Sequence, residues 1–386
     1  MARIALLYFN AGGGHRAAAL ALQALIAEQQ RPWQVDLLNL VELLDPQGRF
    51  ERLTGMAPED LYNRRLKRGW TLGMAQELKL LQAMIRLGHA PMLKALQRHW
   101  AQTEPDLVVS VVPNFNRVLA ESVASTLPGV PFVTVMTDLA DLPPRFWIEP
   151  DVPQHLVCGT PQALAQALAA GVPRQRLHQV SGMVLRPAFY ALPPPDPVGD
   201  RAAERVAERV ALGLPPDAPV GVVMFGGQGP RVMRDIARRL VDRPLILMCG
   251  HNEALAAALR AEPARAPRLV LGFTPEVPRY LRLADYFIGK PGPGALSEAV
   301  HCGLPVITVR NRWTLPQERP NTDWVRQHGL GLVLPGFGRV APAVQALVEQ
   351  LPHYRARVAM LRNRAVFEVV EHLADHLAAL RLHAAA

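Results

Sequence analysis

The chain has 386 residues, of which 49% are hydrophobic and 19% are charged. This composition is typical of a folded globular protein and excludes an intrinsically disordered chain. The 42 lysines and arginines outnumber the 33 aspartates and glutamates and give a net charge of +9, which favours anionic partners such as nucleotides or an acidic membrane surface. No apolar segment of the sequence reaches the roughly 18–20 residues that span a bilayer. Three cysteines without metal-ligand spacing favour reduced thiols in the cytosol.

The first half of the chain alternates strands with helices. Continuous apolar runs predict strands over residues 3–9, 34–38, 107–111 and 132–136. Apolar residues at helical spacing predict a helix over residues 16–29. Such strands between helices indicate a parallel sheet covered on both faces. The apolar run at the N-terminus fits a first strand better than a signal peptide. A helical insertion rich in arginine and methionine, over about residues 40–100, interrupts the alternation.

The alternation begins again after a proline-rich segment at residues 191–199, which we interpret as a linker. Further strands are expected over residues 220–225, 245–249, 269–271, 286–288 and 306–309. The sequence therefore predicts an α/β protein with two Rossmann-like domains, residues 1–190 and 200–367. Ligands of such domains bind at the carboxyl ends of the strands, here in the cleft between the two domains. We expect a C-terminal helix, about residues 368–386, to pack back on the first domain.

The most informative motif is a glycine- and proline-rich turn between a strand and a helix. It contains Lys290, Gly292, Pro293 and Gly294. The free N–H groups and the positive dipole end of the following helix are suited to bind phosphate. Glu298 lies about one helical turn further on, where its carboxylate can accept hydrogen bonds from a ribose. A tight connection that binds no ligand is the alternative.

A second glycine-rich turn ends the first strand. It contains Gly12, Gly13 and Gly14, and His15 follows at the start of the next helix. The helix dipole disfavours a charged imidazole there, so we expect His15 to be neutral and able to accept a proton. The same turn matches the dinucleotide-binding pattern G-x-G-x-x-A, with Asp36 about 20 residues further on. An NAD(P)-dependent oxidoreductase is therefore an alternative at this point.

Other polar residues follow expected strands and are predicted at the same edge of the two sheets. Asp138 is a candidate base, a candidate partner that orients His15, or a helix cap. Gln317 and Glu318 offer an amide and a carboxylate suited to sugar hydroxyls. A backbone nest for phosphate and a second strand end at the cleft are expected at Gly226, Gly227, Gln228, Gly250, His251 and Asn252.

A basic segment lies within the insertion. It contains Arg64, Arg65, Lys67, Arg68 and Trp70, and apolar residues at helical spacing follow it as far as Ile85. This combination suits a helix that lies on an anionic lipid surface. An amphipathic core helix with a solvated basic face is the alternative. Nucleic acid is not expected as a partner, because no stacking surface or known binding module accompanies the charge.

Taken together, these motifs resemble, in collinear order over most of the chain, the monogalactosyldiacylglycerol synthases and processive diacylglycerol glucosyltransferases of glycosyltransferase family 28. The resemblance rests on residues 12–17, 135–139, 183–189, 249–255, 272–273, 290–294 and 317–318, with Asn321. It implies a GT-B fold with an N-terminal acceptor domain and a C-terminal nucleotide-sugar domain. It also implies inverting transfer that needs neither a metal nor another cofactor.

The resemblance implies roles for individual residues. The turn at residues 292–294 would hold the UDP phosphates, Glu298 the ribose, and the pair 317–318 the hexose. Phe273, His251 and Lys290 belong to the same nucleotide-sugar side. His15 or Asp138 would deprotonate a lipid hydroxyl, and the basic segment falls where the family contacts the membrane.

Two departures from the family lie on the acceptor side. After the strand at residues 107–111, the family has a His-Pro pair where this chain has Val112-Pro113-Asn114. After Asp138, the family has His-Pro before a tryptophan, whereas this chain has Pro143-Pro144-Arg145-Phe146-Trp147. The donor end of the predicted site therefore follows the family more closely than the acceptor end.

We predict an enzyme bound peripherally to the cytoplasmic face of the cell membrane. It would transfer galactose or glucose from a UDP-sugar to a lipid, with diacylglycerol as the expected acceptor. The alternatives are an NAD(P)-dependent oxidoreductase, a UDP-sugar epimerase, and a protein of the same fold that binds a nucleotide sugar without catalysis.

Overall fold

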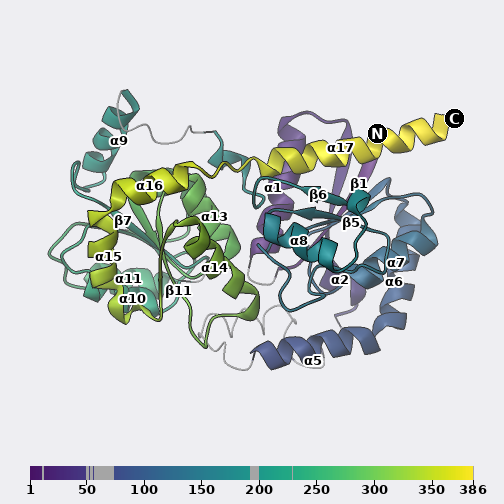
Figure 1. Cartoon of the computed structure of the whole chain (residues 1–386), viewed down its shortest axis with the longest axis horizontal. Coiled ribbons are helices and arrows are strands. Elements are labelled where there is room, and N and C mark those ends of the chain that lie inside the picture. Colours follow the sequence, from purple (N-terminus) through teal and green to yellow (C-terminus); the bar gives the residue numbers. More distant parts are fainter. Residues whose placement is uncertain are drawn as a thin grey trace.

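The computed structural model of the chain describes residues 1–10, 13–48, 52, 55, 74–191, 200–227 and 229–385. Figure 1 shows two α/β halves side by side, with the N-terminal half on the right. Each half contains a six-stranded sheet whose strand pairs are all parallel. The α/β class with two parallel sheets, predicted from the sequence, is confirmed.

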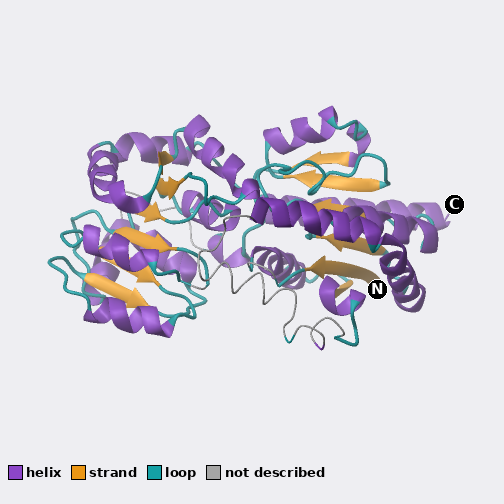
Figure 2. Cartoon of the chain, turned by 90° about the horizontal axis from the view of Figure 1, so that it is seen from below, coloured by secondary structure: helices purple, strands orange, loops and turns teal. Residues whose placement is uncertain are grey.

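The first sheet has the strand order β2-β1-β3-β4-β5-β6. Its strands are β1 (Ala2–Tyr8), β2 (Trp33–Asn39), β3 (Leu107–Ser110), β4 (Phe132–Val135), β5 (Gln154–Cys158) and β6 (Leu177–Gln179). The helices of this half are α1 (Gly14–Glu28), α2 (Leu40–Leu44), α5 (Met74–Leu87), α6 (His89–Thr103), α7 (Asn116–Thr126) and α8 (Pro161–Ala169). Apolar side chains of α1 pack on one face of the sheet and those of α6 and α7 on the other. Figure 2 shows helices on both sides of the strands. Burial on both faces explains why β3 and β4 read as continuous apolar runs.

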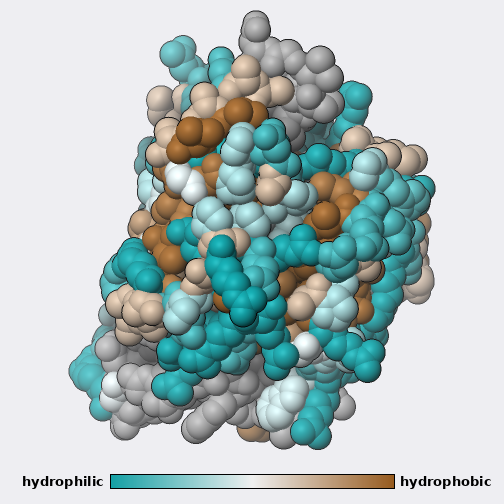
Figure 3. All heavy atoms as spheres, turned by 90° about the vertical axis from the view of Figure 1, so that its left-hand side faces the viewer, coloured by the Kyte–Doolittle hydropathy of each residue, from teal (hydrophilic) through white to brown (hydrophobic). Residues whose placement is uncertain are grey.

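The second sheet has the order β12-β11-β10-β7-β8-β9. Its strands are β7 (Gly221–Met224), β8 (Leu245–Met248), β9 (Arg268–Leu271), β10 (Tyr286–Ile288), β11 (Val306–Val309) and β12 (Gly331–Leu334). Its helices are α9 (Asp200–Ala211), α10 (Val232–Arg239), α11 (Glu253–Ala261), α12 (Val277–Leu283), α13 (Pro293–His301), α14 (Arg319–His328), α15 (Val340–Glu349) and α16 (Leu351–Ala359). Figure 3 looks at this end of the molecule, where hydrophilic side chains cover most of the surface and leave small hydrophobic patches.

Three strands of the structure were not expected from the sequence, namely β5, β6 and β12. β5 begins with Gln154 and His155, and β6 is a three-residue edge strand that carries His178 and Gln179. β12 begins with Gly331, whose φ is 149°. These strands are short and contain polar residues or glycine. They therefore lack the continuous apolar run from which the other strands were predicted.

The last helix, α17 (Ala365–Ala385), leaves the second half and packs on the first sheet beside α1. Its buried residues are Ala365, Val366, Val369, Val370, Leu373 and Leu377. The crossing segment is held by polar contacts: the Asn363 side chain donates to the Met183 carbonyl at 2.9 Å, and the Ser181 N–H donates to Glu368 at 2.6 Å. Glycine is required at position 182, because a Cβ there would lie 2.7 Å from the Asn363 side chain. The two halves are thus joined at two places rather than one.

The insertion at about residues 40–100 is helical where the structure describes it, with α2, α5 and α6. The basic residues Arg64, Arg65, Lys67, Arg68 and Trp70 lie outside the described residues, as does most of the linker, residues 192–199. Among the helices of the described ranges, none combines the length and the apolar character needed to cross a bilayer.

Candidate functional site

The candidate site lies where the strand order of each sheet changes direction. In the second sheet, β7 pairs with β10, so the turn after β7 and the turn after β10 are neighbours. In the first sheet, β1 pairs with β3, and β3 with β4. Open parallel sheets bind ligands at such switch points, outside the carboxyl ends of the strands. The predicted residues that follow these strands are therefore placed at the edges where ligands bind in this class of fold.

The turn between β10 and α13 presents open backbone N–H groups. Gly292 is the N-cap of α13, and no side chain caps the helix. Gly294, in the first turn, is exposed and has open space where a Cβ would lie. Asn321, fully buried in α14, donates from its side chain to the Pro291 carbonyl at 2.7 Å and fixes the turn. An uncapped helix end of this kind can hold an anion without a side-chain charge.

Glu298 is partly buried one turn into α13. Burial raises the pKa of its carboxyl to about 7, and the Arg186 guanidinium, from the other half of the chain, works in the opposite direction. A carboxylate of this kind gains from hydrogen-bond donors such as a pair of hydroxyls, because they replace its lost hydration.

The turns after β7 and β8 pack against each other. The His251 N–H donates to the Gly227 carbonyl at 2.9 Å, and a Cβ on Gly250 would lie 2.3 Å from that same oxygen. Asn252 caps α11 and donates from its side chain to the Gly229 carbonyl at 2.6 Å. Gly226 takes a φ of 81°, which suits glycine. Gln228 lies outside the described residues.

A flat ring surface lies beside these turns. The imidazole of His251 stacks on Phe273, with ring centroids 4.2 Å apart and planes at 14°. The Phe273 side chain is 62% exposed, so an aromatic ligand can reach it. Both residues were expected on the nucleotide-sugar side, and the structure brings them into contact.

His15 opens α1 on the edge of the first sheet. Gly13 is the N-cap with a φ of 80°, and Gly12 lies outside the described residues. The Nδ1 atom of His15 is hydrogen-bonded to the Thr137 hydroxyl at 3.0 Å. Burial lowers the pKa of His15 to about 4, against a backbone hydrogen bond with Val111 that raises it. The imidazole is therefore neutral at pH 7, and desolvation is the largest cause.

Asp138 follows β4 and is 6% exposed. Its Oδ2 atom accepts a hydrogen bond from the indole Nε1 of Trp147 at 3.0 Å. Burial raises the pKa of Asp138 to about 7, and that hydrogen bond opposes the shift. Smaller effects come from Glu318, which raises the pKa, and Lys290, which lowers it. Asp138, which follows β4 of the first sheet, therefore lies close enough to Glu318 and Lys290 of the second half for their charges to affect its pKa.

Lys290 and Glu318 form an ion pair, with Nζ 3.0 Å from Oε1. Glu318 is buried, whereas Lys290 and Gln317 are partly buried. The pair joins the turn after β10 to the loop after β11, so Lys290 contacts a carboxylate rather than standing free for phosphate. This contact between two predicted residues was not foreseen.

Sequence reasoning assigned no role to Trp147 and Thr137, which contact the two candidate bases. Trp147 is fully buried, and its ring centroid lies 6.0 Å from that of His15. The only indication in the sequence was that Trp147 follows the candidate base Asp138 by 9 residues. Within residues 1–48, 74–191 and 200–385, as far as these are described, no group of three or more His, Cys, Asp and Glu side chains is arranged to hold a metal ion.

The geometry does not favour the oxidoreductase alternative. Asp36 lies in the middle of β2, opposite Ala5 of β1, and not at the carboxyl end where a ribose would lie. Its carboxylate also pairs with the Arg3 guanidinium at 2.5 Å.

Comparison with known proteins bears on the family and on the fold. No protein-family model matches the chain. It is 28% identical over 363 residues to the "Probable monogalactosyldiacylglycerol synthase 2, chloroplastic" of Oryza sativa subsp. japonica, which covers 85% of this chain and 70% of that one. It is 26% identical over 413 residues to the "Probable monogalactosyldiacylglycerol synthase, chloroplastic" of Glycine max, with 96% and 71% covered.

A solved structure with a similar fold is the MurG protein of Acinetobacter baumannii. It matches with a TM-score of 0.60 at 14% identity and covers 97% of this chain and 100% of that one. The chain is therefore similar over most of its length to monogalactosyldiacylglycerol synthases, and it has the two-sheet fold of GT-B glycosyltransferases.

Proposed function

We propose that this chain is an inverting glycosyltransferase that transfers a hexose from a UDP-sugar to a lipid hydroxyl, with diacylglycerol as the acceptor. The sequence similarity to monogalactosyldiacylglycerol synthases supports the reaction class and the acceptor. The observation that carries the proposal is that polar residues from both halves lie near one another at one site. A buried carboxylate of the first sheet lies within electrostatic reach of the Lys290–Glu318 pair of the second.

The donor binds to the second sheet. The uncapped N-terminus of α13 holds the diphosphate at Gly292, Pro293 and Gly294, and Glu298 accepts hydrogen bonds from the ribose. The turns after β7 and β8 and the His251–Phe273 stack border the nucleotide. Gln317 and Glu318 face the hexose, which places the anomeric carbon toward the first sheet.

Asp138 is the base. Its pKa of about 7 matches neutral pH better than the value of about 4 for His15, and general bases work best when their pKa lies near the working pH. The lipid oxygen attacks the anomeric carbon, its proton passes to Asp138, and the bond from that carbon to the phosphate oxygen breaks. The electron pair leaves with UDP, whose charge is stabilised by the N-terminus of α13. His15, held by Thr137, is a neutral group that positions the acceptor hydroxyl.

Helix α5 and the basic segment before it form the membrane contact. α5 exposes Leu80, Leu81, Met84 and Leu87. The chain would act as a peripheral protein on the cytoplasmic face of the cell membrane, where both the UDP-sugar and the lipid are accessible.

The test is a transfer assay with UDP-galactose or UDP-glucose and diacylglycerol, with EDTA present. The unaltered protein should form glycolipid and UDP. Asp138→Asn should lower kcat by about 10²–10⁴-fold, and Glu298→Gln should raise the KM for the UDP-sugar with a smaller effect on kcat. Glu349→Gln, at the exposed end of α15, is the matched control and should leave both constants unchanged.

Absence of turnover with every UDP-sugar, together with absence of UDP binding, would overturn the proposal. UDP binding without turnover that is unaffected by Asp138→Asn would identify a non-catalytic binding protein. Conversion of the UDP-sugar without any lipid would point to an epimerase.

A further inference from the structure

A second exposed apolar group lies on the same edge of the molecule as α5, but it belongs to the other half. The turn at residues 311–314, between β11 and α14, carries Arg312 and Trp313. The Trp313 side chain is 42% exposed and Arg312 is exposed as well. Figure 1 shows α5 and the loop between β11 and α14 along the lower edge of the molecule, one from each half.

The turn is held rigid by its own hydrogen bonds. The Asn311 N–H donates to the Thr314 hydroxyl at 3.0 Å, and the Trp313 N–H donates to the Asn311 side chain at 2.9 Å. The Asn311 amide also donates to the Pro335 carbonyl at 3.1 Å, just after β12. A turn braced in this way presents Trp313 in a fixed position, so burying the indole against another surface costs little conformational entropy.

The chemistry of the pair fits the boundary between lipid and water. The Arg312 guanidinium lies 5.3 Å from the centroid of the Trp313 ring. An indole has an apolar body and a polar N–H group, and tryptophan is enriched at the level of the lipid headgroups for that reason. An arginine beside it attracts anionic headgroups. The net charge of +9 acts in the same direction.

We propose that the Arg312–Trp313 turn is a second contact with an anionic bilayer, additional to α5, so that both halves of the molecule touch the lipid surface. The membrane is favoured over a protein partner because the turn lies on the same edge of the molecule as α5, where exposed leucines and a methionine accompany Arg86. The choice of a membrane rests on the contact proposed above for α5, whereas lipid binding itself does not require that the protein transfers a sugar.

The position of the turn explains what the contact would do. Trp313 precedes the Gln317–Glu318 turn by four residues in the same loop, and Glu318 pairs with Lys290 in the candidate site. A membrane contact at this point brings the mouth of the site to the lipid headgroups. A lipid hydroxyl then needs only a short displacement to reach the site.

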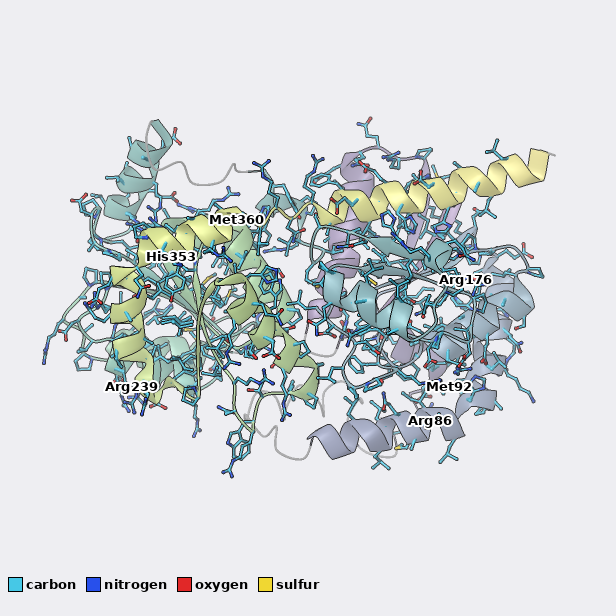
Figure 4. All side chains as sticks on the ribbon, viewed as in Figure 1. Arg86, Met92, Arg176, Arg239, His353 and Met360 are labelled. Carbon is cyan, nitrogen blue, oxygen red and sulfur yellow. The ribbon has the colours of Figure 1, made fainter. Side chains whose placement is uncertain are left out.

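The experiment measures binding of the full chain to vesicles of phosphatidylcholine with and without phosphatidylglycerol. Trp313→Ala should weaken binding about tenfold, and Arg312→Gln roughly fivefold on the anionic vesicles only. Met360→Ala is the matched control, because Met360 is 71% exposed and lies on the upper edge in Figure 4, away from Arg86 of α5. It should bind as the unaltered protein does.

A second readout uses brominated phospholipid, which quenches tryptophans that enter the headgroup layer. In a Trp70→Phe background, which removes the tryptophan of the basic segment, the protein should lose fluorescence on these vesicles. Adding Trp313→Phe should remove most of that loss. Unchanged affinity of Trp313→Ala, or equal quenching of both proteins, would overturn the proposal. Turnover of Trp313→Ala should also be compared on vesicles and on a detergent-dispersed short-chain diacylglycerol. An equal loss with both substrates would overturn the proposal too, because the turn would then act within the site. A failure of the proposed function would show instead as absence of turnover by the unaltered protein with vesicle binding intact.

Discussion

Trp147 is the residue that relates the two candidate bases to each other. Its indole donates to Asp138, and its ring lies near that of His15. A hydrogen bond to a carboxylate favours the charged form, so Trp147 holds the pKa of Asp138 below the value that burial alone would give. Trp147 is therefore a positioning residue that also adjusts the basicity of Asp138.

Trp147→Phe should raise the pKa of Asp138 above about 7, because the carboxylate loses its donor. A base is active when deprotonated, so activity rises with pH through its pKa, and the acid limb of kcat/KM should move up by roughly one unit. Activity should recover at higher pH.

Trp100→Phe is the matched control for this prediction. Trp100 is also fully buried, and its Nε1 donates to Ser122 at 2.8 Å, away from the candidate site. It should lower stability without moving the acid limb. An equal displacement in both variants would show that the effect comes from loosened packing.

His15 and Asp138 were chosen from the sequence because both follow strands of a predicted parallel sheet, and β1 and β4 do precede them in the structure. Their contacts could not be predicted. Trp147 reaches Asp138 through an irregular loop, whose path depends on packing rather than on any periodicity. Burial, which dominates both pKa shifts, is likewise a property of the folded chain.

Among the elements, α13 shows most directly how a turn sequence leaves backbone groups open at the start of a helix. Its N-cap is glycine, a proline occupies the first turn, and Gly294 leaves open space beside the backbone. The turn was predicted from the sequence because glycine and proline mark turns between regular elements. Its bracing by Asn321 of α14 was not, since the two elements meet only in the fold.

Gly294→Ala should keep the protein folded, with an unchanged or slightly higher Tm, because the methyl group meets nothing and alanine favours a helix. The same methyl group would occupy the space that a diphosphate approaches. The rise in Tm on adding UDP should therefore shrink, with an affinity about tenfold weaker or more. Gly338→Ala, which also has open space around its Cβ, should keep the full rise. A full rise in both variants would argue against phosphate at α13.

At the scale of the whole molecule, the contact between α17 and the first sheet contains four histidines. His178 stacks on His372 with ring centroids 4.0 Å apart, and His155 lies 4.5 Å from His376. Burial lowers the pKa of His155 to about 4 and of His372 to about 3, and the pKa of His376 is lowered as well. The nearby charges are Arg176, which opposes protonation of His155, and Asp375, which favours protonation of His376.

Acid should therefore weaken the docking of α17. The pKa of an unfolded histidine is about 6.5, so the folded state binds fewer protons below that pH. Stability is then complete above about pH 6.5 and falls as the pH drops toward 4. Urea unfolding at pH 7.5 and pH 5.0 should show a loss on the order of 1 kcal/mol for each of His155 and His372, allowing for partial exposure to water.

His372→Gln should reduce this pH dependence, whereas His353→Gln should not. His353 is exposed on α16, at the upper left in Figure 4. An unchanged slope in His372→Gln would assign the acid sensitivity to other groups.

The packing of α17 also determines when the first sheet can be completed during synthesis. β1 to β6 leave the ribosome long before Ala365 does, yet one face of their core includes Val366, Val369 and Leu373. Until those residues emerge, the apolar surface of the first sheet that α17 covers stays exposed while the second sheet is synthesised. The part of the chain that is translated first is thus among the last to finish folding, and a break in the chain before α17 would leave both products incomplete.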